Sequence, residues 1–392
     1  MNILVVDNLL LPFDPEQSPG GTERRNLSDS ISFAKEGHNT YLTICGPFKE
    51  KLYKGVKLVN LIPVSKEETD SQSSWRKEVL RRLELFCSKN KIDVVHYGCN
   101  AHYWIANFLV FKRKIPLTVH IGNLLTTNAM YDSGRLQTLY ALKEAGVTFT
   151  FNTQTCEQQF HKLALNLLKK TKVVHPYVLA KLADKNSFRL TNHINLNNQG
   201  WGAVGNKSIK RVFPSEGYAI IACRVDPIKK LHLYEKIDFP CKIYLKYRKS
   251  TDLNNYSDNL LARLRTNKNI EIYLDEDYSL IQEAFSKAAL CLVTCPTETF
   301  GITAFEASSF GVPTVVLKKS SSDINATEEF LKPLYEPKTI EYRRGWREEL
   351  SSHIKSIDNS IENRIALARK TKEIYSYEKY ITERLERLKE LL

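Results

Sequence analysis

Two carboxylates follow one apolar stretch in the second half of the chain. Glu298 lies in a turn directly after a predicted strand that ends at Thr294, and Glu306 lies about one turn into a helix that is expected to begin near Ile302. Both carboxylates can therefore face one bound ligand. Because carboxylate oxygens accept hydrogen bonds from hydroxyl groups but are poor partners for phosphate, the pair favours a ligand with at least one vicinal diol.

The same turn offers a place for a phosphate group. Gly301 carries no side chain, so an anion can approach its backbone closely. The helix predicted from Ile302 to Gly311 would present unpaired N–H groups in its first turn. In open α/β sheets, ligands bind at the edge formed by the carboxyl ends of the strands, and a strand, a turn and a helix in this order place the segment at that edge. The expected ligand therefore carries a diphosphate as well as a diol.

This segment resembles the retaining glycosyltransferases of the GT-B fold, and specifically the large glycosyltransferase family 4. The positions in register are Glu298, Phe300, Gly301, Glu306, Ala307, Gly311 and Pro313. In that family the first glutamate contacts the donor sugar and the second contacts the ribose, which implies these roles for Glu298 and Glu306. Phe300, Gly301 and Ile302 are then expected to bind the donor beside them. The resemblance implies an α/β protein with two Rossmann-like domains that face each other across a donor-binding cleft.

A second match follows the first predicted strand of the second half. The family has an arginine and, five residues later, a lysine that together hold the donor diphosphate, and Arg224 and Lys229 keep this spacing. Two cations aimed at a diphosphate can stabilise the leaving group in place of a metal ion. The family usually has glycine before the arginine and after the lysine, where this chain has Cys223 and Lys230. That departure leaves the geometry of the loop open.

Two further matches lie in the first half of the chain. Gly20 and Gly21 precede a predicted helix and resemble the glycine loop of the family, which implies a close approach to a phosphate or to the acceptor. Alone, such a pair is typical of a flexible turn. His120 ends a predicted strand where the family often has a histidine near the donor sugar, which implies a sugar-contacting role beside the simpler structural interpretation. His96 matches another family position without an obvious function.

The acidic run Asp275-Glu276-Asp277 is identical to the metal-binding triplet of a different glycosyltransferase fold. The rest of the chain does not resemble that fold, and a Mg²⁺ site needs converging oxygens beyond one acidic turn. No metal site is therefore predicted. The resemblance implies metal-independent hexosyl transfer with retention at the anomeric carbon, with a UDP-sugar as the favoured donor.

Strands and helices alternate along both halves of the chain. The strands predicted for the first half cover residues 2–7, 40–45, 92–97, 116–120, 147–152 and 172–175, and the helices between them cover 21–36, 73–90, 101–112 and 153–169. The strands predicted for the second half cover residues 218–223, 243–245, 270–274, 289–294 and 313–317. Alternation of this kind predicts parallel sheets covered on both faces.

The predicted domain boundary is a stretch rich in Asn, Gly and Lys over 184–215. We expect an acceptor domain over 1–200 and a donor domain over 214–375. Residues 338–391 are charged and helix-forming, and 376–392 is expected to form a C-terminal helix that can pack back on the N-terminal domain.

The basic charge is concentrated in the first half. The chain has 392 residues and a net charge of +13, of which residues 1–213 carry +12. Such a surface attracts an anionic partner, unless the charges are simply solvated. The favoured acceptor is a glycan or lipid-linked glycan at an anionic membrane surface, which the basic helices around Trp75 to Arg82 and Trp104 to Lys114 could contact. Two alternatives remain: a phage-like DNA glycosyltransferase that modifies a hydroxymethylated base, and a non-catalytic nucleotide-sugar-binding protein.

Cysteine usage and hydropathy bear on the compartment. The eight cysteines include no CxxC pair and several lie in strand-like apolar runs, which favours buried thiols in a reducing compartment. No run approaches the roughly 20 apolar residues of a membrane span, and Met1 leads directly into an apolar strand without a basic leader. A cytoplasmic protein is expected, with peripheral attachment to the inner face of a membrane as one option.

Overall fold

The computed structural model describes residues 1–7, 21–45, 50–61, 72–98, 103–121, 138–139, 141–142, 145–151, 153–158, 212–247, 256–295, 298, 301–320, 325–375 and 377–392. The chain forms two compact units. The first comprises Met1–Gly200 and Tyr377–Leu392, and the second comprises Trp201–Ser376. The strand predicted over 172–175, most of the helix predicted over 153–169 and most of the stretch 184–215 lie outside the described residues.

The first unit contains a seven-stranded sheet with the order β3-β4-β2-β1-β5-β6-β7. Its strands are β1 (Asn2–Val6), β2 (Asn39–Thr43), β3 (Glu50–Tyr53), β4 (Val56–Val59), β5 (Val94–Tyr97), β6 (Leu117–Ile121) and β7 (Thr148–Phe151). Neighbouring strands are parallel except β3 and β4. Without β3, the parallel strands follow the order 3-2-1-4-5-6 along the chain, which is the order of a Rossmann fold. The strands predicted from the sequence between residues 2 and 152 are confirmed as β1, β2, β5, β6 and β7.

The hairpin of β3 and β4 was not predicted. Lys54 and Gly55 join the two strands, and both have positive φ angles, of 48° and 85°. A two-residue turn with two left-handed residues matches the twist of a hairpin. Most of β3 is exposed, so it lacks the apolar pattern by which a strand is recognised in a sequence.

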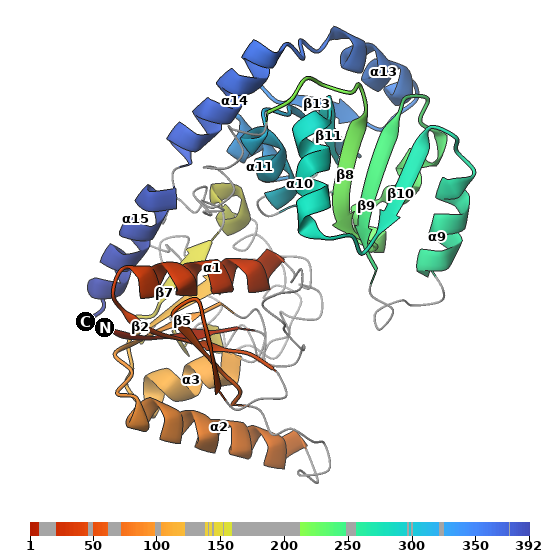
Figure 1. Ribbon diagram of the computed structural model, residues 1–392. Helices are drawn as coiled ribbons and strands as arrows, with labels where there is room; N and C mark the ends of the chain where they lie inside the picture. Colours follow the sequence, from red (N-terminus) through yellow and green to blue (C-terminus); the bar gives the residue numbers. More distant parts are fainter. Residues whose placement is uncertain are drawn as a thin grey trace. The chain divides into compact units, whose positions relative to one another are not determined.

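Helices cover both faces of the first sheet (Figure 1). On one face lie α1 (Gly21–Lys35) and α15 (Tyr377–Lys389), and on the other lie α2 (Gln72–Lys89) and α3 (Tyr103–Phe111). Ile3 and Val5 of β1 belong to the core beneath α1, whereas Leu4 and Val6 belong to the core beneath α2 and α3. Because both faces are buried, the central strand has apolar residues in sequence rather than in alternation.

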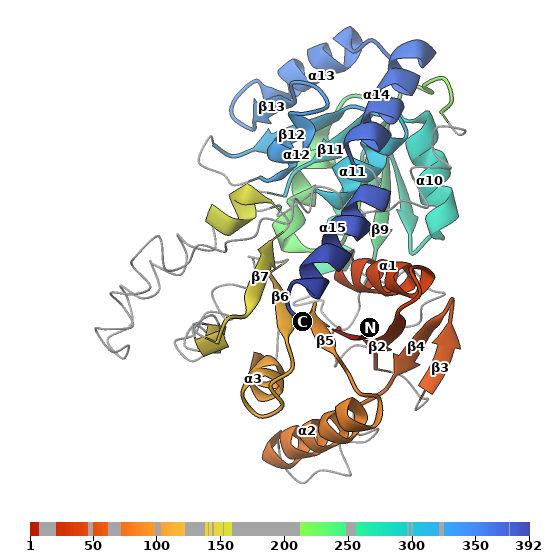
Figure 2. The ribbon, with the colours of Figure 1, turned by 90° about the vertical axis from the view of Figure 1, so that its left-hand side faces the viewer.

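A buried polar network attaches α15 to the sheet and to α1, beside which it lies in both views (Figures 1 and 2). Arg384 of α15 forms an ion pair of 3.1 Å with Asp29 of α1, and both side chains are almost fully buried. The hydroxyl of Tyr380 donates to both carboxylate oxygens of Asp29, each at 3.0 Å. Arg384 also contacts Nε2 of His96 on β5 at 2.8 Å.

The second unit contains a six-stranded sheet with the order β10-β9-β8-β11-β12-β13. Its strands are β8 (Ala219–Arg224), β9 (Cys241–Lys246), β10 (Ile270–Leu274), β11 (Leu290–Val293), β12 (Thr314–Lys318) and β13 (Lys338–Glu341). All neighbours are parallel, again in the order 3-2-1-4-5-6. The five strands predicted for this half are confirmed as β8 to β12.

The prediction that residues 338–391 are helical is wrong at its start. Lys338–Glu341 forms the edge strand β13, parallel to β12. Only Ile340 in this strand is fully buried, so the four residues carry almost no apolar signal. The remainder of the region contains α13 (Trp346–Ser356), α14 (Ile361–Ile374) and α15, as predicted.

Helices also cover both faces of the second sheet. One face packs against the 3₁₀ helix η5 (Leu231–Lys236), α9 (Tyr256–Arg265) and α13. The other packs against α10 (Tyr278–Lys287), α11 (Ile302–Ser309), α12 (Thr327–Leu331) and α14. Gly311, two residues after the end of α11, has φ of 73°, and an added Cβ would lie 2.1 Å from the backbone oxygen of Arg364 in α14. The close approach of α14 therefore requires glycine at this position. None of the described helices is both long and apolar enough to span a membrane.

Candidate functional site

The order of the second sheet places two predicted motifs next to each other. β8 and β11 are neighbours in the middle of the sheet. The strands that follow β8, namely β9 and β10, lie toward one edge, and the strands that follow β11, namely β12 and β13, lie toward the other. Ligands of open α/β sheets bind at such a switch point, beyond the carboxyl ends of the strands. Arg224 ends β8 and Lys229 follows it, whereas Glu298 and Gly301 follow β11. The two motifs, well separated along the chain, therefore lie together and form one candidate site.

Lys229 and Glu298 form an ion pair at this site. Nζ of Lys229 lies 3.0 Å from Oε2 of Glu298, and each side chain is about one fifth exposed (22% and 20%). Burial on its own would lower the pKa of Lys229, but the attraction of the Glu298 carboxylate outweighs it, so the pKa is raised. Lys229 therefore keeps its positive charge at neutral pH.

The loop that bears Lys229 is shaped by Asp226. One carboxylate oxygen of Asp226 accepts a hydrogen bond from the backbone N–H of Ile228 at 3.0 Å, and Pro227 opens the 3₁₀ helix η4 (Pro227–Lys229). The other oxygen lies 3.2 Å from the guanidinium of Arg224, which remains about half exposed (48%). Asp226 therefore positions both the loop and the arginine.

The two departures from the glycine pattern of the family have different structural consequences. Lys230 has φ of 52° and ψ of 33°, which is the left-handed conformation that glycine adopts without strain. The loop thus keeps a backbone typical of glycine with lysine in its place. Burial raises the pKa of the Cys223 thiol to about 12, so this residue is a neutral side chain beside the cations.

Three hydroxyl groups connect the loop to the neighbouring strand and helix. Thr294, at the end of β11, donates to the backbone carbonyl of Lys229 at 2.5 Å and accepts from the hydroxyl of the fully buried Tyr234 at 3.0 Å. Thr303 of α11 donates to the carbonyl of Ala222 in β8 at 2.9 Å. These bonds fix the backbone at Ala222 near the end of β8 and at Lys229 in the loop that follows.

The backbone of Glu298 is attached to the start of α12. The backbone carbonyl of Glu298 accepts from the N–H of Ala326 at 2.8 Å. Gly301 has φ of 89°, and an added Cβ would lie 2.4 Å from Oγ1 of Thr327. Both the conformation and the space therefore require glycine there. Ile302 begins α11 and packs partly buried against the core, and Phe300 lies outside the described residues.

A small pocket of about 30 Å³ lies at the same point. Its lining residues are Ile221, Ala222, Cys223, Lys229, Leu292, Val293, Thr294, Cys295, Glu298, Gly301 and Thr303. A volume of this size holds a water molecule or a single ligand group. The pocket is therefore one contact point of a larger ligand rather than the whole of its site.

Glu306 lies within α11 and is almost fully buried, with 4% of its surface exposed. Its Oε1 accepts a hydrogen bond of 2.5 Å from the hydroxyl of Tyr278, the first residue of α10. Tyr278 was not singled out in the sequence, and neither were Tyr234, Thr294 and Asp226. The pair Asp226-Pro227 is a helix-start signal that could have been recognised, whereas the two tyrosines act across 28 and 60 residues of chain without a local pattern.

The predicted site residues of the first half belong to the first unit. Gly20 lies outside the described residues, and Gly21 is the first residue of α1. His120 on β6 is fully buried, and its Nδ1 lies 3.0 Å from the hydroxyl of Thr150 on β7. A sugar-contacting role for His120 and a ligand-contacting role for the glycines stay predictions.

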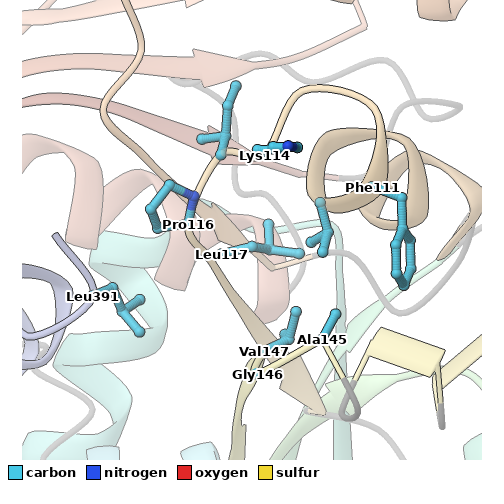
Figure 3. Close-up of a pocket in the computed structure, with 10 residues that line it drawn as sticks. Phe111, Lys114, Pro116, Leu117, Ala145, Gly146, Val147 and Leu391 are labelled. Carbon is cyan, nitrogen blue, oxygen red and sulfur yellow. The ribbon is translucent and has the colours of Figure 1, made fainter.

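A second hollow, of about 440 Å³, lies in the first unit. Its walls are the end of α3 with Phe111, the start of β6 with Leu117, and the residues before β7, including Val147 (Figure 3). It lies at the amino ends of β6 and β7, the edge opposite to the one where open α/β sheets bind ligands. The predicted site residues take no part in it.

Two residues of the acidic triplet have local structural positions. Asp275 accepts from the backbone N–H of Tyr247 at 3.0 Å, and Asp277 precedes α10 as its N-cap residue without a capping hydrogen bond from its side chain. Within the described residues, no three His, Cys, Asp or Glu side chains converge in a way that could hold a metal ion.

Comparison with known proteins supplies the fold. No protein-family model matches the sequence, and no curated protein sequence matches it. Many solved structures are similar over almost the full length of both chains, and three of them are described next. Sucrose-phosphate synthase from Thermosynechococcus elongatus covers 100% of this chain and 99% of its own, with a TM-score of 0.67 and 11% identity. HepE from Anabaena covers 100% of both chains, with a TM-score of 0.62 and 16% identity.

The catalytic domain of starch synthase IV from Arabidopsis thaliana covers 99% of both chains, with a TM-score of 0.61 and 12% identity. At such identities the likeness concerns the fold. This chain therefore has the GT-B fold, with two Rossmann-like domains, as the resemblance in its second half implied.

Proposed function

We propose that the protein is a retaining glycosyltransferase that moves a sugar from a nucleotide diphosphate sugar to an acceptor. The observation that carries this proposal is the arrangement at the switch point of the second sheet. Arg224 and Lys229 lie at the end of β8, and Glu298 lies beyond β11 in contact with Lys229. Cations suit a diphosphate and carboxylates suit hydroxyl groups, so one donor molecule satisfies both.

Each residue then has a distinct role. Arg224 and Lys229 bind the diphosphate, Glu298 accepts from a hydroxyl group of the donor sugar, and Glu306 accepts from the ribose. The acceptor oxygen forms a bond to the anomeric carbon on the face from which the phosphate oxygen leaves, and the electron pair of the broken bond stays on that oxygen. The acceptor proton passes to the leaving phosphate. The two cations stabilise the charge that develops there, which is the role that a metal ion fills in other transferases.

Uridine is the favoured base of the donor. The HepE structures are complexes with UDP, with UDP and glucose, and with UDP-glucose, and an Escherichia coli structure of the same fold is bound to UDP-2-fluoro glucose. The starch synthase structure contains ADP and acarbose, so ADP belongs in the same test.

A thermal-shift panel with UDP, GDP, ADP, CMP and their sugar conjugates tests the proposal. A ligand that binds the folded state alone raises the melting temperature. We expect one nucleoside diphosphate to raise it and Arg224→Ala to remove that shift. Arg263→Ala is the matched control, because Arg263 is also half exposed and ion-paired to a carboxylate of the same unit, at 2.8 Å from Glu235. If no nucleotide shifts the wild type, the proposal is wrong.

For the acceptor we propose a glycan or lipid-linked glycan at an anionic membrane surface, supported by the +12 charge of residues 1–213. The tryptophans of the basic helices are engaged within the protein. The rings of Trp75 and Trp104 are 5.9 Å apart, both pack against the core beneath α2 and α3, and Arg76 lies 5.7 Å from the Trp104 ring. Attraction to the membrane therefore rests on the exposed basic side chains.

A further inference from the structure

We propose that Tyr278 is a positioning residue of the donor site, whose hydroxyl holds the carboxylate of Glu306 in the orientation that binds the ribose. The inference rests on the proposed function and deepens it, because it names the group that orients the ribose-binding carboxylate before the donor binds. The contact that carries it is the hydrogen bond of 2.5 Å from the Tyr278 hydroxyl to Oε1 of Glu306.

The fold brings the two residues together at the ligand-binding edge. Tyr278 begins α10, and α10 follows β10 in a parallel sheet, so its first residue lies near the carboxyl ends of the strands. Glu306 is the fifth residue of the neighbouring α11 (Figure 1). Side chains of a helix lean toward its N-terminus, which directs the Glu306 carboxylate toward the same edge.

Burial explains why Glu306 needs a partner of this kind. A carboxylate that is removed from water must recover hydrogen bonds, and its three side-chain torsions must be restricted before it can bind a diol with both oxygens. Hydrogen bonds to a charged acceptor are about twice as strong as neutral ones. A carboxylate has about four acceptor positions, so the single bond from Tyr278 does not occupy all of them.

The ring and the hydroxyl of Tyr278 have separable roles. The ring packs partly buried against the apolar cluster that includes Phe305 and Ala304. Tyr278→Phe therefore keeps this packing and removes only the hydroxyl group that donates the hydrogen bond to Glu306. The chain also contains a matched control. The hydroxyl of Tyr273 on β10 donates to Oε2 of Glu271, again at 2.5 Å, and this bond is exposed to solvent.

The experiment measures affinity for paired nucleotides by isothermal titration calorimetry. The probes are UDP and 2′-deoxy-UDP, with GDP, ADP and their 2′-deoxy forms as further pairs. We expect the wild type to prefer the ribonucleotide of one pair. We expect Tyr278→Phe to weaken binding of that ribonucleotide about tenfold and to reduce its preference over the deoxy form, while Tyr273→Phe changes neither.

The outcomes separate the inference from the proposed function. If the wild type binds none of the nucleotides, the proposed function fails and the inference fails with it. If the wild type prefers a ribonucleotide and Tyr278→Phe keeps the same affinity and preference, the inference alone is overturned. An equal loss in Tyr273→Phe also overturns it, because the loss would then not depend on Glu306.

A double-mutant cycle tests whether Tyr278 acts through Glu306. Glu306→Ala removes the acceptor of the Tyr278 hydroxyl altogether. If Tyr278 only orients this carboxylate, adding Tyr278→Phe to Glu306→Ala should weaken ribonucleotide binding less than twofold further. Losses that multiply in the double variant would contradict a role through Glu306. The melting temperature of each ligand-free variant verifies that it is folded.

Discussion

The ion pair between Lys229 and Glu298 sets a condition on the proposed binding of a donor. The charged Lys229 is already paired with the Glu298 carboxylate at 3.0 Å, so a diphosphate that binds as proposed must compete with Glu298 for the ammonium group and is repelled by the carboxylate. In the proposed mechanism the exchange is productive, because the diphosphate takes over Lys229 and Glu298 becomes available to the donor sugar.

Replacing Glu298 should therefore have opposite effects on two ligands. In Glu298→Gln, we expect UDP to bind about three- to tenfold more tightly, because the charge that competes with the diphosphate is gone. We also expect the sugar of a UDP-sugar to add no affinity in this variant, and sugar transfer to be lost. Calorimetry with both ligands and a transfer assay measure this. Glu235→Gln is the control, since Glu235 is equally shielded and pairs with Arg263 at 2.8 Å. Unchanged UDP affinity in Glu298→Gln would refute the competition.

Lys230 carries backbone strain that glycine would remove. Its φ of 52° lies in the left-handed region, which costs a residue with a Cβ roughly 1 kcal/mol relative to glycine. We expect Lys230→Gly to stabilise the second unit by up to about 1 kcal/mol, measured by urea unfolding. Lys236→Gly, at an exposed 3₁₀-helical position of the same unit, should be neutral or destabilising. Destabilisation by Lys230→Gly would mean that the lysine side chain contributes more than its backbone costs.

Among the elements, α15 depends on a histidine that must stay neutral. Arginine has no acceptor, so Nε2 of His96 accepts from Arg384, and the ring proton resides on Nδ1, which lies 2.7 Å from the hydroxyl of Thr118. Burial, followed by the charges of Arg384 and Arg25, holds the pKa of His96 well below its usual 6.5. A protonated ring would oppose Arg384 with a second donor.

The sign of the resulting pH dependence follows from this shift. Below about pH 6.5 the unfolded chain binds a proton at His96 that the folded first unit does not bind. The contribution of neutral His96 to the free energy of unfolding is therefore fully present above pH 6.5. It falls by about 1.4 kcal/mol per pH unit below this value, until the pKa of His96 in the folded chain is reached. Hydrogen exchange of α15 in urea at pH 7.5, 6.5 and 5.5 should show this loss. His96→Gln should flatten it, and an unchanged slope in that variant would exclude His96 as the cause.

For the molecule as a whole, the uneven charge makes salt the means of separating acceptor classes. A DNA-acting enzyme neutralises several phosphates, so its acceptor affinity falls steeply, by orders of magnitude between about 50 and 200 mM salt. For a glycan acceptor, we expect the Michaelis constant for the acceptor to change by less than about threefold over this range, measured with soluble glycan acceptors and with hydroxymethylated DNA. Transfer to DNA with a steep salt dependence would replace the proposed acceptor.

Much of the fold could be predicted from the sequence, and so could the local placement of some residues of the candidate site. The apolar runs of β1, β5 and β11 are recognisable because buried parallel strands are apolar on both faces. The placement of Glu298, Gly301 and Glu306 after β11 and in α11 could be predicted because they belong to one short stretch of chain, and their roles stay predictions. Elements without an apolar pattern, such as β3 and β13, could not be recognised, since edge strands are largely exposed.

The pairing of the site residues depended on the order of strands. Lys229 meets Glu298 across 69 residues because β8 and β11 are neighbours, and Arg384 meets Asp29 across 355 residues because the last helix belongs to the first unit. A sequence expresses local geometry through the spacing of side chains along one element. Contacts between elements follow from how sheets and helices bury their apolar faces together, and therefore the partners of Lys229, Glu306 and His96 became known from the folded chain alone.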